Sequence, residues 1–274
     1  SDVCSSDLTV VVVDYSDPVI STCSLPMKAM RYLLLVLIFF SGVQAQAQER
    51  FSIFVGSAQE NVDRMIRIAN LRDDDVVLDL GSGDGRIVFT AARANDKLKG
   101  RGVDIDPKLV REANEDAKKY KMSDRVQFEL RDVFDADLKE ATVITMWLWP
   151  EMQRMLRTKI LAEARPGTKV LTNIWDLGTW PPDVTDTVDS SSVYLWFVPA
   201  KVAGNWAWEH NYAGGKRVYD AVLDQQFQKA EGVVRQGTRR GVLDKMTLRG
   251  ADINFTLGMT VADVGFVKIG RAHV

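Results

Sequence analysis

The segment from Asp79 to Gly85 reads Asp-Leu-Gly-Ser-Gly-Asp-Gly and is the part of this sequence best suited to hold a small ligand. It follows an apolar run that begins at Val76 and precedes a helical pattern, so loop N–H groups would face a ligand at a helix N-terminus. Glycines at alternate positions, with Gly81 and Gly83 before Gly85, permit the φ > 0 conformations of a tight turn. We expect a ligand-binding loop; a turn that merely requires glycine is the alternative.

The charges around this loop indicate which ligand it takes. Arg86 stands where a dinucleotide-binding fingerprint requires a third glycine. Asp79 ends the preceding strand, and a carboxylate there repels a pyrophosphate but attracts a cation. The loop therefore favours the cationic methionine end of S-adenosyl-L-methionine over a dinucleotide, with Ser82 among the expected contacts.

Two further carboxylates end strand-like runs. Asp104, followed by Ile105, lies where the ribose-binding acid of a nucleotide-binding βαβ unit is found. Asp106 competes for that role, but the proline after it favours capping of the next helix. Asp132, followed by Val133, could accept a hydrogen bond from an adenine amino group, and the alternative is a turn-capping aspartate. We expect Asp104, Ile105, Asp132 and Val133 to contact the cofactor.

An apolar, aromatic segment follows the fourth strand and is expected to line the acceptor pocket. Trp147 and Trp149 could hold an aliphatic amine by cation–π attraction, and Glu151 could orient its charge. Trp147 could equally serve only to bury apolar area. Trp175 is a second candidate for the pocket rim, with interdomain packing as its alternative. His210 is a weak candidate for a general base, because a lone histidine on a strand is more often structural.

The pattern of the chain predicts how these residues are positioned. Strands are expected over residues 76–80, 100–105, 126–130, 141–149 and 169–174. Helical patterns lie between them, and the first helix is expected to begin with a capping box at Ser57 and Glu60. This alternation predicts an α/β, Rossmann-like, mostly parallel sheet with helices on both faces, in which ligands bind at the carboxyl ends of the strands.

Helical periodicity stops near Asp183, and alternating segments follow. They are expected to form a C-terminal antiparallel β-rich appendage over residues 184–268, after a cofactor-binding domain over residues 51–183. The alternating segments that carry this prediction are 193–198, 206–210, 218–223, 242–248 and 252–257.

We expect both ends of the chain to differ in origin from its middle. One DNA sequence, read on its two strands, can encode both residues 2–7 and residues 269–274, and it resembles a sequencing adapter. We expect residues 1–26 to be non-native or upstream translated residues and residues 269–274 to be adapter-derived. Residues 27–47 combine a basic start, an apolar run and a small-x-small site, which is typical of a signal peptide.

A membrane tether and a buried core helix are the alternatives for residues 27–47. We therefore expect an exported, periplasmic or membrane-associated protein, with a cytoplasmic domain as a further possibility. Both cysteines, Cys4 and Cys23, precede Met27, so we expect no metal site of the Cys/His kind. The net charge of −2 gives no basic face, so no nucleic-acid partner is expected. Oligomeric state is left open.

Residues 51–183 resemble class I methyltransferases, and more closely the bacterial relatives of the family that methylates a lysine of the ATP-synthase c subunit. The motifs that carry the resemblance are residues 76–88, 102–107, 131–134 and 142–150. The resemblance implies cofactor contacts at Asp79, Gly81, Gly83, Asp104 and Asp132. One departure is Val55-Gly56-Ser57, where these relatives usually carry a Pro-Thr-Pro type segment.

The resemblance implies methylation by in-line displacement, with S-adenosyl-L-methionine as donor and a protein lysine, in some cases of a membrane protein, as acceptor. A small-molecule methyltransferase remains the second hypothesis. A third is an exported or membrane-tethered binding protein whose Rossmann core no longer catalyses.

Overall fold

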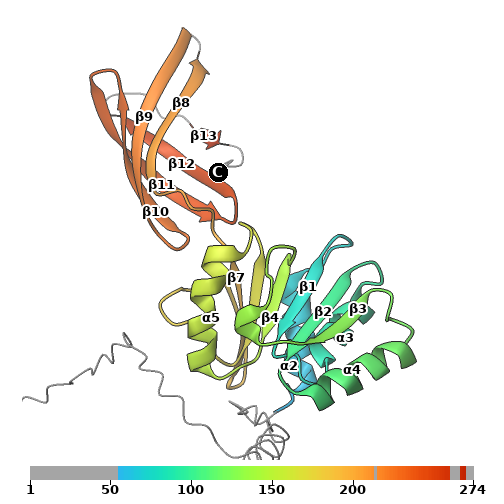
Figure 1. Cartoon of the computed structure of the whole chain (residues 1–274). Helices are drawn as coiled ribbons and strands as arrows, with labels where there is room; N and C mark the ends of the chain where they lie inside the picture. Colours follow the sequence, from blue (N-terminus) through green and yellow to red (C-terminus); the bar gives the residue numbers. More distant parts are fainter. Residues whose placement is uncertain (1–54, 213–214, 260–265, 270–274) are drawn as a thin grey trace, which may run out of the picture. The chain divides into compact units, whose positions relative to one another are not determined.

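The computed structural model describes residues 55–212, 215–259 and 266–269, in which two β-sheets follow one another along the chain (Figure 1). The predicted signal peptide lies outside the described residues, as do nearly all the residues expected to be non-native. The first part contains, in order, α2 (Gln59–Ala69), β1 (Val76–Leu80), α3 (Arg86–Ala94), β2 (Lys99–Asp104), α4 (Pro107–Lys119), β3 (Val126–Leu130), the 3-10 helix η1 (Val133–Asp135), β4 (Val143–Met146), α5 (Pro150–Glu163), β5 (Lys169–Asn173), β6 (Val184–Val188) and β7 (Ser191–Phe197).

Among the described residues, the first sheet has seven strands in the order β3-β2-β1-β4-β5-β7-β6. Strands β1 to β5 pair in parallel, and β7 runs antiparallel between β5 and β6. The chain order reverses between β1 and β4, which is the switch point where open α/β sheets bind ligands. The predicted mostly parallel Rossmann-like sheet is confirmed.

The first sheet extends past Asp183, where the sequence pattern placed the end of the cofactor-binding domain. Strand β7 pairs with β5 through Lys169 opposite Phe197, and β6 pairs with β7. Residues 193–198, which the pattern assigned to the β-rich appendage, therefore lie mostly in this sheet. An alternating pattern reports antiparallel pairing but not which sheet supplies the partner.

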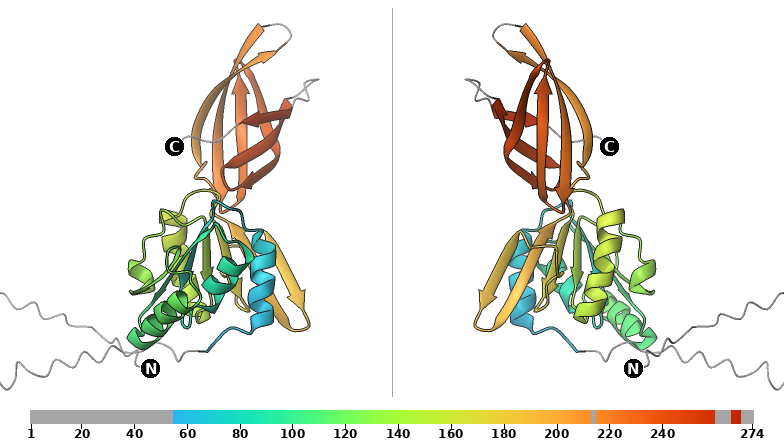
Figure 2. Two further views of the ribbon diagram at one scale, coloured as in Figure 1. Left: turned by 90° about the vertical axis from the view of Figure 1, so that its right-hand side faces the viewer. Right: turned by 90° about the vertical axis from the view of Figure 1, so that its left-hand side faces the viewer.

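Helices cover both faces of this sheet, as predicted (Figure 2). Helices α2, α3 and α4 bury their apolar stripes in one core, which includes Val77 and Val143 from the sheet. Helix α5 packs on the opposite face, where Leu156 and Ile160 meet Ile144. Both faces of the central strands are thus covered, so these strands read as continuous apolar runs.

Two predicted element boundaries near the site are wrong. Strand β4 ends at Met146 rather than at Trp149, so the segment 147–149 is a loop, and Pro150 begins α5. The capping box predicted at Ser57 is absent, because α2 begins after Ala58 with no side-chain cap. A proline suits the first turn of a helix. Pro150 therefore predicts the start of α5 better than the apolar run over residues 141–149 predicts the end of β4.

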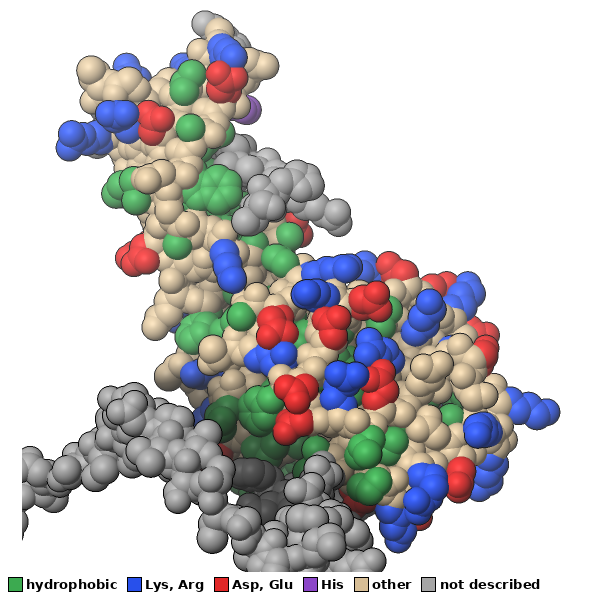
Figure 3. Space-filling model, in the orientation of Figure 1, with side chains coloured by type: hydrophobic (Ala, Val, Ile, Leu, Met, Phe, Trp, Pro, Cys, Tyr) green, Lys and Arg blue, Asp and Glu red, His purple; other side chains and the backbone are tan. Residues whose placement is uncertain are grey.

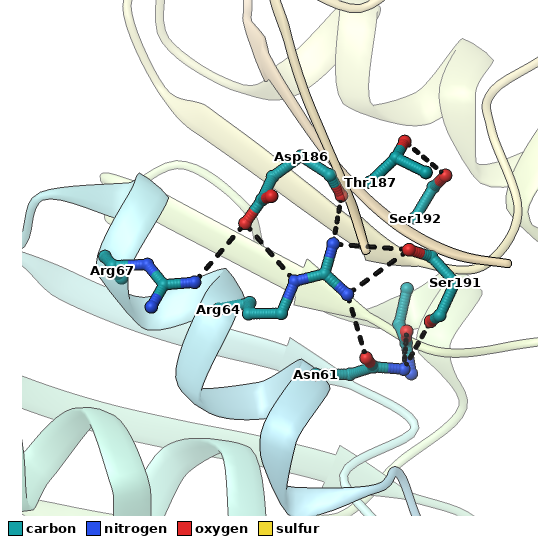
Figure 4. Close-up of polar contacts among 8 residues, drawn as sticks. Asn61, Arg64, Arg67, Asp186, Thr187, Ser191 and Ser192 are labelled. Atoms are coloured by element: carbon teal, nitrogen blue, oxygen red, sulfur yellow. Dashed lines mark hydrogen bonds and ion pairs between the residues drawn. The ribbon is translucent and has the colours of Figure 1, made fainter. Parts of the chain in front are cut away.

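Helix α2 is tied to the β6–β7 hairpin by buried polar contacts (Figure 4). Arg64 forms an ion pair with Asp186 at 3.2 Å and donates to the Ser191 carbonyl oxygen. Asn61 donates to Asn173 Oδ1 at 3.0 Å and to Ser191 Oγ at 2.8 Å. A charge buried this deeply needs such partners, and the contacts fix the N-terminal half of α2 beside the carboxyl end of β5.

The second sheet is an antiparallel meander in which, over the described residues, six strands pair in chain order. Its strands are β8 (Gly204–Tyr212), β9 (Gly215–Gln226), β10 (Lys229–Gln236), β11 (Arg239–Arg249), β12 (Asp252–Met259) and β13 (Phe266–Ile269). One face buries an apolar core that includes Leu223, Val234 and Leu243. The predicted antiparallel C-terminal region is confirmed. Throughout the part of the chain that the structure describes, no helix is long and apolar enough to span a membrane.

Candidate functional site

A cavity opens at the carboxyl ends of β1, β2 and β4, where ligands bind in open α/β sheets. The lining residues come from the segments 55–57, 79–87, 104–109 and 147–148. Four segments that are far apart in sequence thus converge at the switch point of the sheet. Of the residues expected to contact the cofactor or acceptor, Asp79, Gly81, Ser82, Asp104, Ile105 and Trp147 line this cavity.

The glycine loop has the backbone geometry that its sequence predicts. Gly81, Gly83 and Gly85 have φ values of 78°, 54° and 77°, and Gly85 is the N-cap of α3. The N–H groups of Gly81 and Ser82 both donate to the Val103 carbonyl oxygen at 2.9 Å, which fixes the loop to the end of β2. The Ser82 hydroxyl is buried, with no hydrogen-bond partner among the described residues. Rigid positioning of this kind prepares a loop for a ligand.

Asp79 carries a buried carboxylate that is only half satisfied. It is 1% exposed, and its Oδ1 accepts a hydrogen bond from Thr145 Oγ1 at 2.7 Å. Its Oδ2 has no partner within the described part of the chain, although Asp79 lines the cavity. Burial raises the pKa of this carboxyl to about 7, the Thr145 hydroxyl opposes the rise, and Asp104 and Asp84 add to it. A cationic group in the cavity would satisfy both the charge and the free oxygen.

The affinity for a ligand with an ammonium group is expected to depend on pH near neutrality. Because the pKa of Asp79 is about 7, the carboxyl is largely protonated at pH 6 and largely ionised at pH 8. S-Adenosyl-L-homocysteine should therefore bind about tenfold more tightly at pH 8 than at pH 6, as calorimetry can measure. Thr145→Val removes the hydrogen bond to Oδ1 and should move this transition to higher pH. A flat profile in both proteins would contradict the assignment.

Asp104 faces the glycine loop from the end of β2. Its Oδ2 accepts from the Gly83 N–H at 2.8 Å, and its Oδ1 accepts from the Asp106 N–H at 2.9 Å. Asp106 accepts from the Lys108 N–H and caps α4, as its position before proline predicts. Asp104 therefore lies where it can both brace the loop and accept hydrogen bonds from a ribose.

The cavity wall includes a segment that the sequence did not identify. Val55, Gly56 and Ser57 line it, although this segment departs from the Pro-Thr-Pro pattern of the relatives. Arg86 Nη1 donates to the Ser57 carbonyl oxygen at 2.6 Å, and the guanidinium also pairs with Asp84 at 2.5 Å. A Cβ added to Gly56 would meet the Arg86 guanidinium, which would have to shift from its present position. In the sequence, the glycine just before α2 is the feature that could have identified this segment as part of the cavity wall.

Several expected contacts do not line this cavity. Asp132 is exposed and accepts from the Phe134 N–H at 2.9 Å, so it caps η1, while Val133 is buried in the core behind it. Gly83 and Gly85 shape the loop and do not line the cavity themselves. The alternative reading of Asp132, a turn-capping aspartate, describes its contacts in this structure.

The expected acceptor residues separate into one that lines the cavity and two that do not. Trp147 is partly buried and lines the cavity next to Leu148. Trp149 is 54% exposed and is the N-cap residue of α5, and Glu151 is exposed in the first turn of that helix. Buried Gln153 donates to the Leu148 carbonyl oxygen at 2.8 Å and holds this loop in place.

Two weaker candidates lie elsewhere. Trp175 is 43% exposed in the loop after β5, next to Ile174, whose φ of 67° is unusual for a β-branched residue. This loop is at the same edge of the sheet as the cavity, but it does not line it. His210 is exposed on β8 of the second sheet, outside the cavity.

Known proteins resemble the part of this chain that holds the cavity. Residues 79–184 match the family model of the ANTKMT methyltransferase domain. A protein-lysine N-methyltransferase from Saccharolobus islandicus is 36% identical over 149 residues, which cover 53% of this chain and 92% of that protein. The adenine nucleotide translocase lysine N-methyltransferase of Mus musculus is 30% identical, and the match covers 47% of this chain and 56% of that protein.

A solved structure adds the ligand. The crystal structure of an RNA methyltransferase from Salinibacter ruber, in complex with S-adenosyl-L-homocysteine, is 41% identical with a TM-score of 0.52. The match covers 54% of this chain and 96% of that one. The half-satisfied buried carboxylate beside the glycine loop fits the ammonium of such a ligand. The chain therefore belongs to the family of the Saccharolobus protein-lysine N-methyltransferase, with the ANTKMT methyltransferase domain, and it is an S-adenosyl-L-methionine-dependent methyltransferase.

Proposed function

We propose that this enzyme transfers the methyl group to the side-chain amine of a lysine in a protein. The observation that carries the proposal is that the free carboxylate oxygen of Asp79 and the aromatic wall of Trp147 belong to one cavity. The first holds a cationic cofactor, and the second suits an aliphatic amine. The names of the Saccharolobus and Mus musculus relatives, both lysine N-methyltransferases, favour lysine as the acceptor.

The cavity residues divide between cofactor and acceptor in this proposal. Asp79 holds the ammonium of the methionine end, Asp104 accepts from the ribose hydroxyls, and the loop from Gly81 to Gly85 supplies backbone N–H groups. Arg86 and Asp84 hold the segment 55–57 as a wall over the methionine end. Asp132 remains a candidate for the adenine amino group only if its loop turns toward the cavity when the cofactor binds.

S-Adenosyl-L-methionine supplies an electrophilic methyl group on a sulfonium. The protein must present a neutral amine to it, because an ammonium has no lone pair with which to attack. The Trp147 ring attracts the incoming lysine as an ammonium. Loss of water as the side chain enters the pocket beside Leu148 lowers the pKa of that lysine and favours its neutral form. The amine nitrogen then forms the new N–C bond as the C–S bond breaks, and the nitrogen releases its proton to solvent. Positioning in a dry pocket provides much of the catalysis.

Replacing Trp147 should weaken the use of the amine acceptor without loss of the cofactor. For Trp147→Leu we expect kcat/KM for the acceptor to fall about tenfold, which is the size of a partly desolvated cation–π contact plus lost packing. The affinity for S-adenosyl-L-homocysteine should change less than about threefold. Trp149→Leu is the matched control, because Trp149 is exposed and outside the cavity. Equal losses in the two variants would remove Trp147 from the acceptor site.

The acceptor can be tested directly with radiolabelled methyl donor and a cell extract. Acid hydrolysis of the labelled product should release N-methyllysine, and prior acetylation of the extract should abolish labelling because it blocks lysine amines. Asp79→Asn serves as the inactive control. Label that survives acetylation would overturn the lysine proposal.

An RNA acceptor is the second candidate, because the Salinibacter structure is described as an RNA methyltransferase. Ribonuclease and protease treatment of the labelled product distinguish the two. Loss of label with ribonuclease alone would favour RNA, and loss with protease alone would favour protein. A formal net charge of −2 gives this chain little general attraction for RNA.

We also propose that the N-terminal apolar segment keeps the enzyme at the membrane with its cavity on the cytosolic side. S-Adenosyl-L-methionine is made in the cytosol, so a fully exported enzyme would lack its donor. Fractionation of cells that express the full chain, followed by protease treatment of intact spheroplasts, tests this. Digestion of the catalytic domain from outside would contradict the cytosolic placement.

A further inference from the structure

The outward face of the second sheet carries a row of exposed valines across three neighbouring strands. Val222 of β9 lies opposite Val233 of β10, and Val233 lies opposite Val242 of β11. The three side chains are 53%, 57% and 54% exposed. Alternate residues, such as Leu223 and Val234, point into the core on the other face. We call Val222, Val233 and Val242 the valine row.

Charges of opposite sign flank the valine row on its two sides. Arg235 and Arg240 lie two positions along their strands from Val233 and Val242, on the same face. They lie opposite each other and form an arginine row. An acidic row lies on the same face, two positions from the valine row in the opposite direction along the strands. It consists of Asp224, Glu231 and Asp244. The outward face therefore has an apolar centre, with an acidic row on one side and, on the other, the two arginines with Asp220 beside them.

The acidic row is unfavourable within one chain. Asp224 lies directly opposite Glu231 in the register of β9 and β10. Like charges at directly opposed positions destabilise a sheet. On the other side, Arg235 pairs with Asp220 at 3.1 Å, but both side chains are more than half exposed, so the pair contributes little. A partner that brings a cation to Glu231 would relieve the repulsion.

The face is also hollowed. A shallow, open groove runs over the segments of β8 to β11 that include Val222, Val233, Arg235 and Arg240. On the surface of this sheet, hydrophobic side chains lie exposed among charged ones (Figure 3). The groove thus joins the valine row to the arginine row.

We propose that a second copy of this chain packs on the outward face, with a two-fold axis parallel to the valine row. Rotation about that axis sets the two valine rows against each other. It also places the arginine row of each copy over the acidic row of the other, with Arg240 facing the second copy's Asp244 and Arg235 facing its Glu231. A two-fold axis parallel to the strands would instead oppose rows of like charge, so the charge pattern selects one geometry. Such an interface is isologous and closed.

Sedimentation of the purified full chain tests the proposal. We expect a concentration-dependent dimer over about a hundredfold range of loading, weakened by salt because exposed charges are screened. The triple change Val222→Thr, Val233→Thr and Val242→Thr keeps the side-chain shape and strand preference but removes apolar contact, and it should raise the dimer Kd at least tenfold. Val218→Thr is the matched control, since Val218 is 51% exposed on β9 outside the valine row; it should leave the Kd unchanged.

Charge exchange tests whether the charged rows meet across the interface. One variant carries Arg235→Glu and Arg240→Glu, and a second carries Glu231→Lys and Asp244→Lys. Each variant alone sets like charges against each other at these positions and should be monomeric, whereas an equimolar mixture should form a heterodimer. S-Adenosyl-L-homocysteine binding and circular dichroism show that each variant is folded.

A monomeric wild-type chain would overturn the proposal, as would a dimer that the valine and charge variants leave intact. A charge-exchanged pair that fails to associate, although both proteins fold, would also overturn it, because the charged rows would then not meet across the interface. None of these outcomes depends on the methyl acceptor.

Discussion

Asp79→Asn is expected to lower the affinity for S-adenosyl-L-homocysteine at least about a hundredfold at pH 8, because it removes one partner of a buried charge pair. Asparagine keeps the shape of the side chain and can still accept from Thr145 Oγ1, so the change isolates the charge on the cavity side. Titration calorimetry measures the loss. Asp137→Asn is the control, since Asp137 is an exposed carboxylate outside the cavity.

The same change should stabilise the ligand-free protein. The pKa of Asp79 is raised from 3.8 to about 7 in the folded state, so the folded state binds its proton more tightly than the unfolded chain does. The corresponding stabilisation is complete below about pH 4 and is lost as the pH rises through about 7. At pH 8 the wild type therefore bears the full cost of a buried carboxylate, on the order of a few kcal/mol.

Asp79→Asn removes that cost. Its Tm should exceed that of the wild type at pH 8, and the difference should shrink at about pH 5. Loss of binding together with a lower Tm at pH 8 would indicate a damaged fold instead of a lost charge. An unchanged affinity in a well-folded variant would remove Asp79 from the cofactor site.

Gly85→Ala is expected to destabilise the fold by about 2 to 5 kcal/mol. Gly85 has a φ of 77°, which costs a residue with a Cβ about 1 to 2 kcal/mol. The new Cβ would also lie 2.5 Å from Phe128 Cζ and 3.0 Å from Phe89 Cε2, and overpacking of a core adds about 1 to 3 kcal/mol. Thermal denaturation should show a Tm lower by about 5 to 15 °C.

Gly167→Ala separates the two causes of that loss. Gly167 has a φ of 92°, but a Cβ there would meet nothing within 4 Å. This variant should lose only the backbone part, about 1 to 2 kcal/mol. Equal losses of stability in the two variants would mean that the close approach of the phenyl rings to Gly85 does not contribute. Glycine would then be needed at this position only for its positive φ.

The cofactor site could be predicted where its determinants are local in sequence. The glycines need φ > 0 and follow an apolar strand, and both facts can be read within ten positions around Asp79. Asp104 could be placed because parallel strands joined by right-handed crossovers end at one edge of the sheet. That rule brings the ends of β1 and β2 together whatever the details of packing.

Other predictions failed where the partner of a segment lies far along the chain. The loop at Val55–Ser57 belongs to the cavity because Arg86, 29 positions after Ser57, donates to the Ser57 carbonyl oxygen. Asp132 lies two residues past the end of β3, its backbone turns into η1, and its carboxylate caps that turn. Strands β6 and β7 alternate like the second sheet, yet β7 pairs with β5 and β6 pairs with β7. Period-two patterning does not specify the partner strand.

The sequence by itself determined the glycine loop, the class of cofactor and the edge of the sheet where the site lies. These follow from residue types at short spacing and from the handedness of the chain. The tertiary structure decided the ionisation behaviour of the site. Thr145, 66 positions from Asp79, hydrogen-bonds one carboxylate oxygen and leaves the other free in a buried cavity, which holds the pKa near 7. Burial and pairing of this kind depend on the register between distant strands, and no local pattern encodes that register.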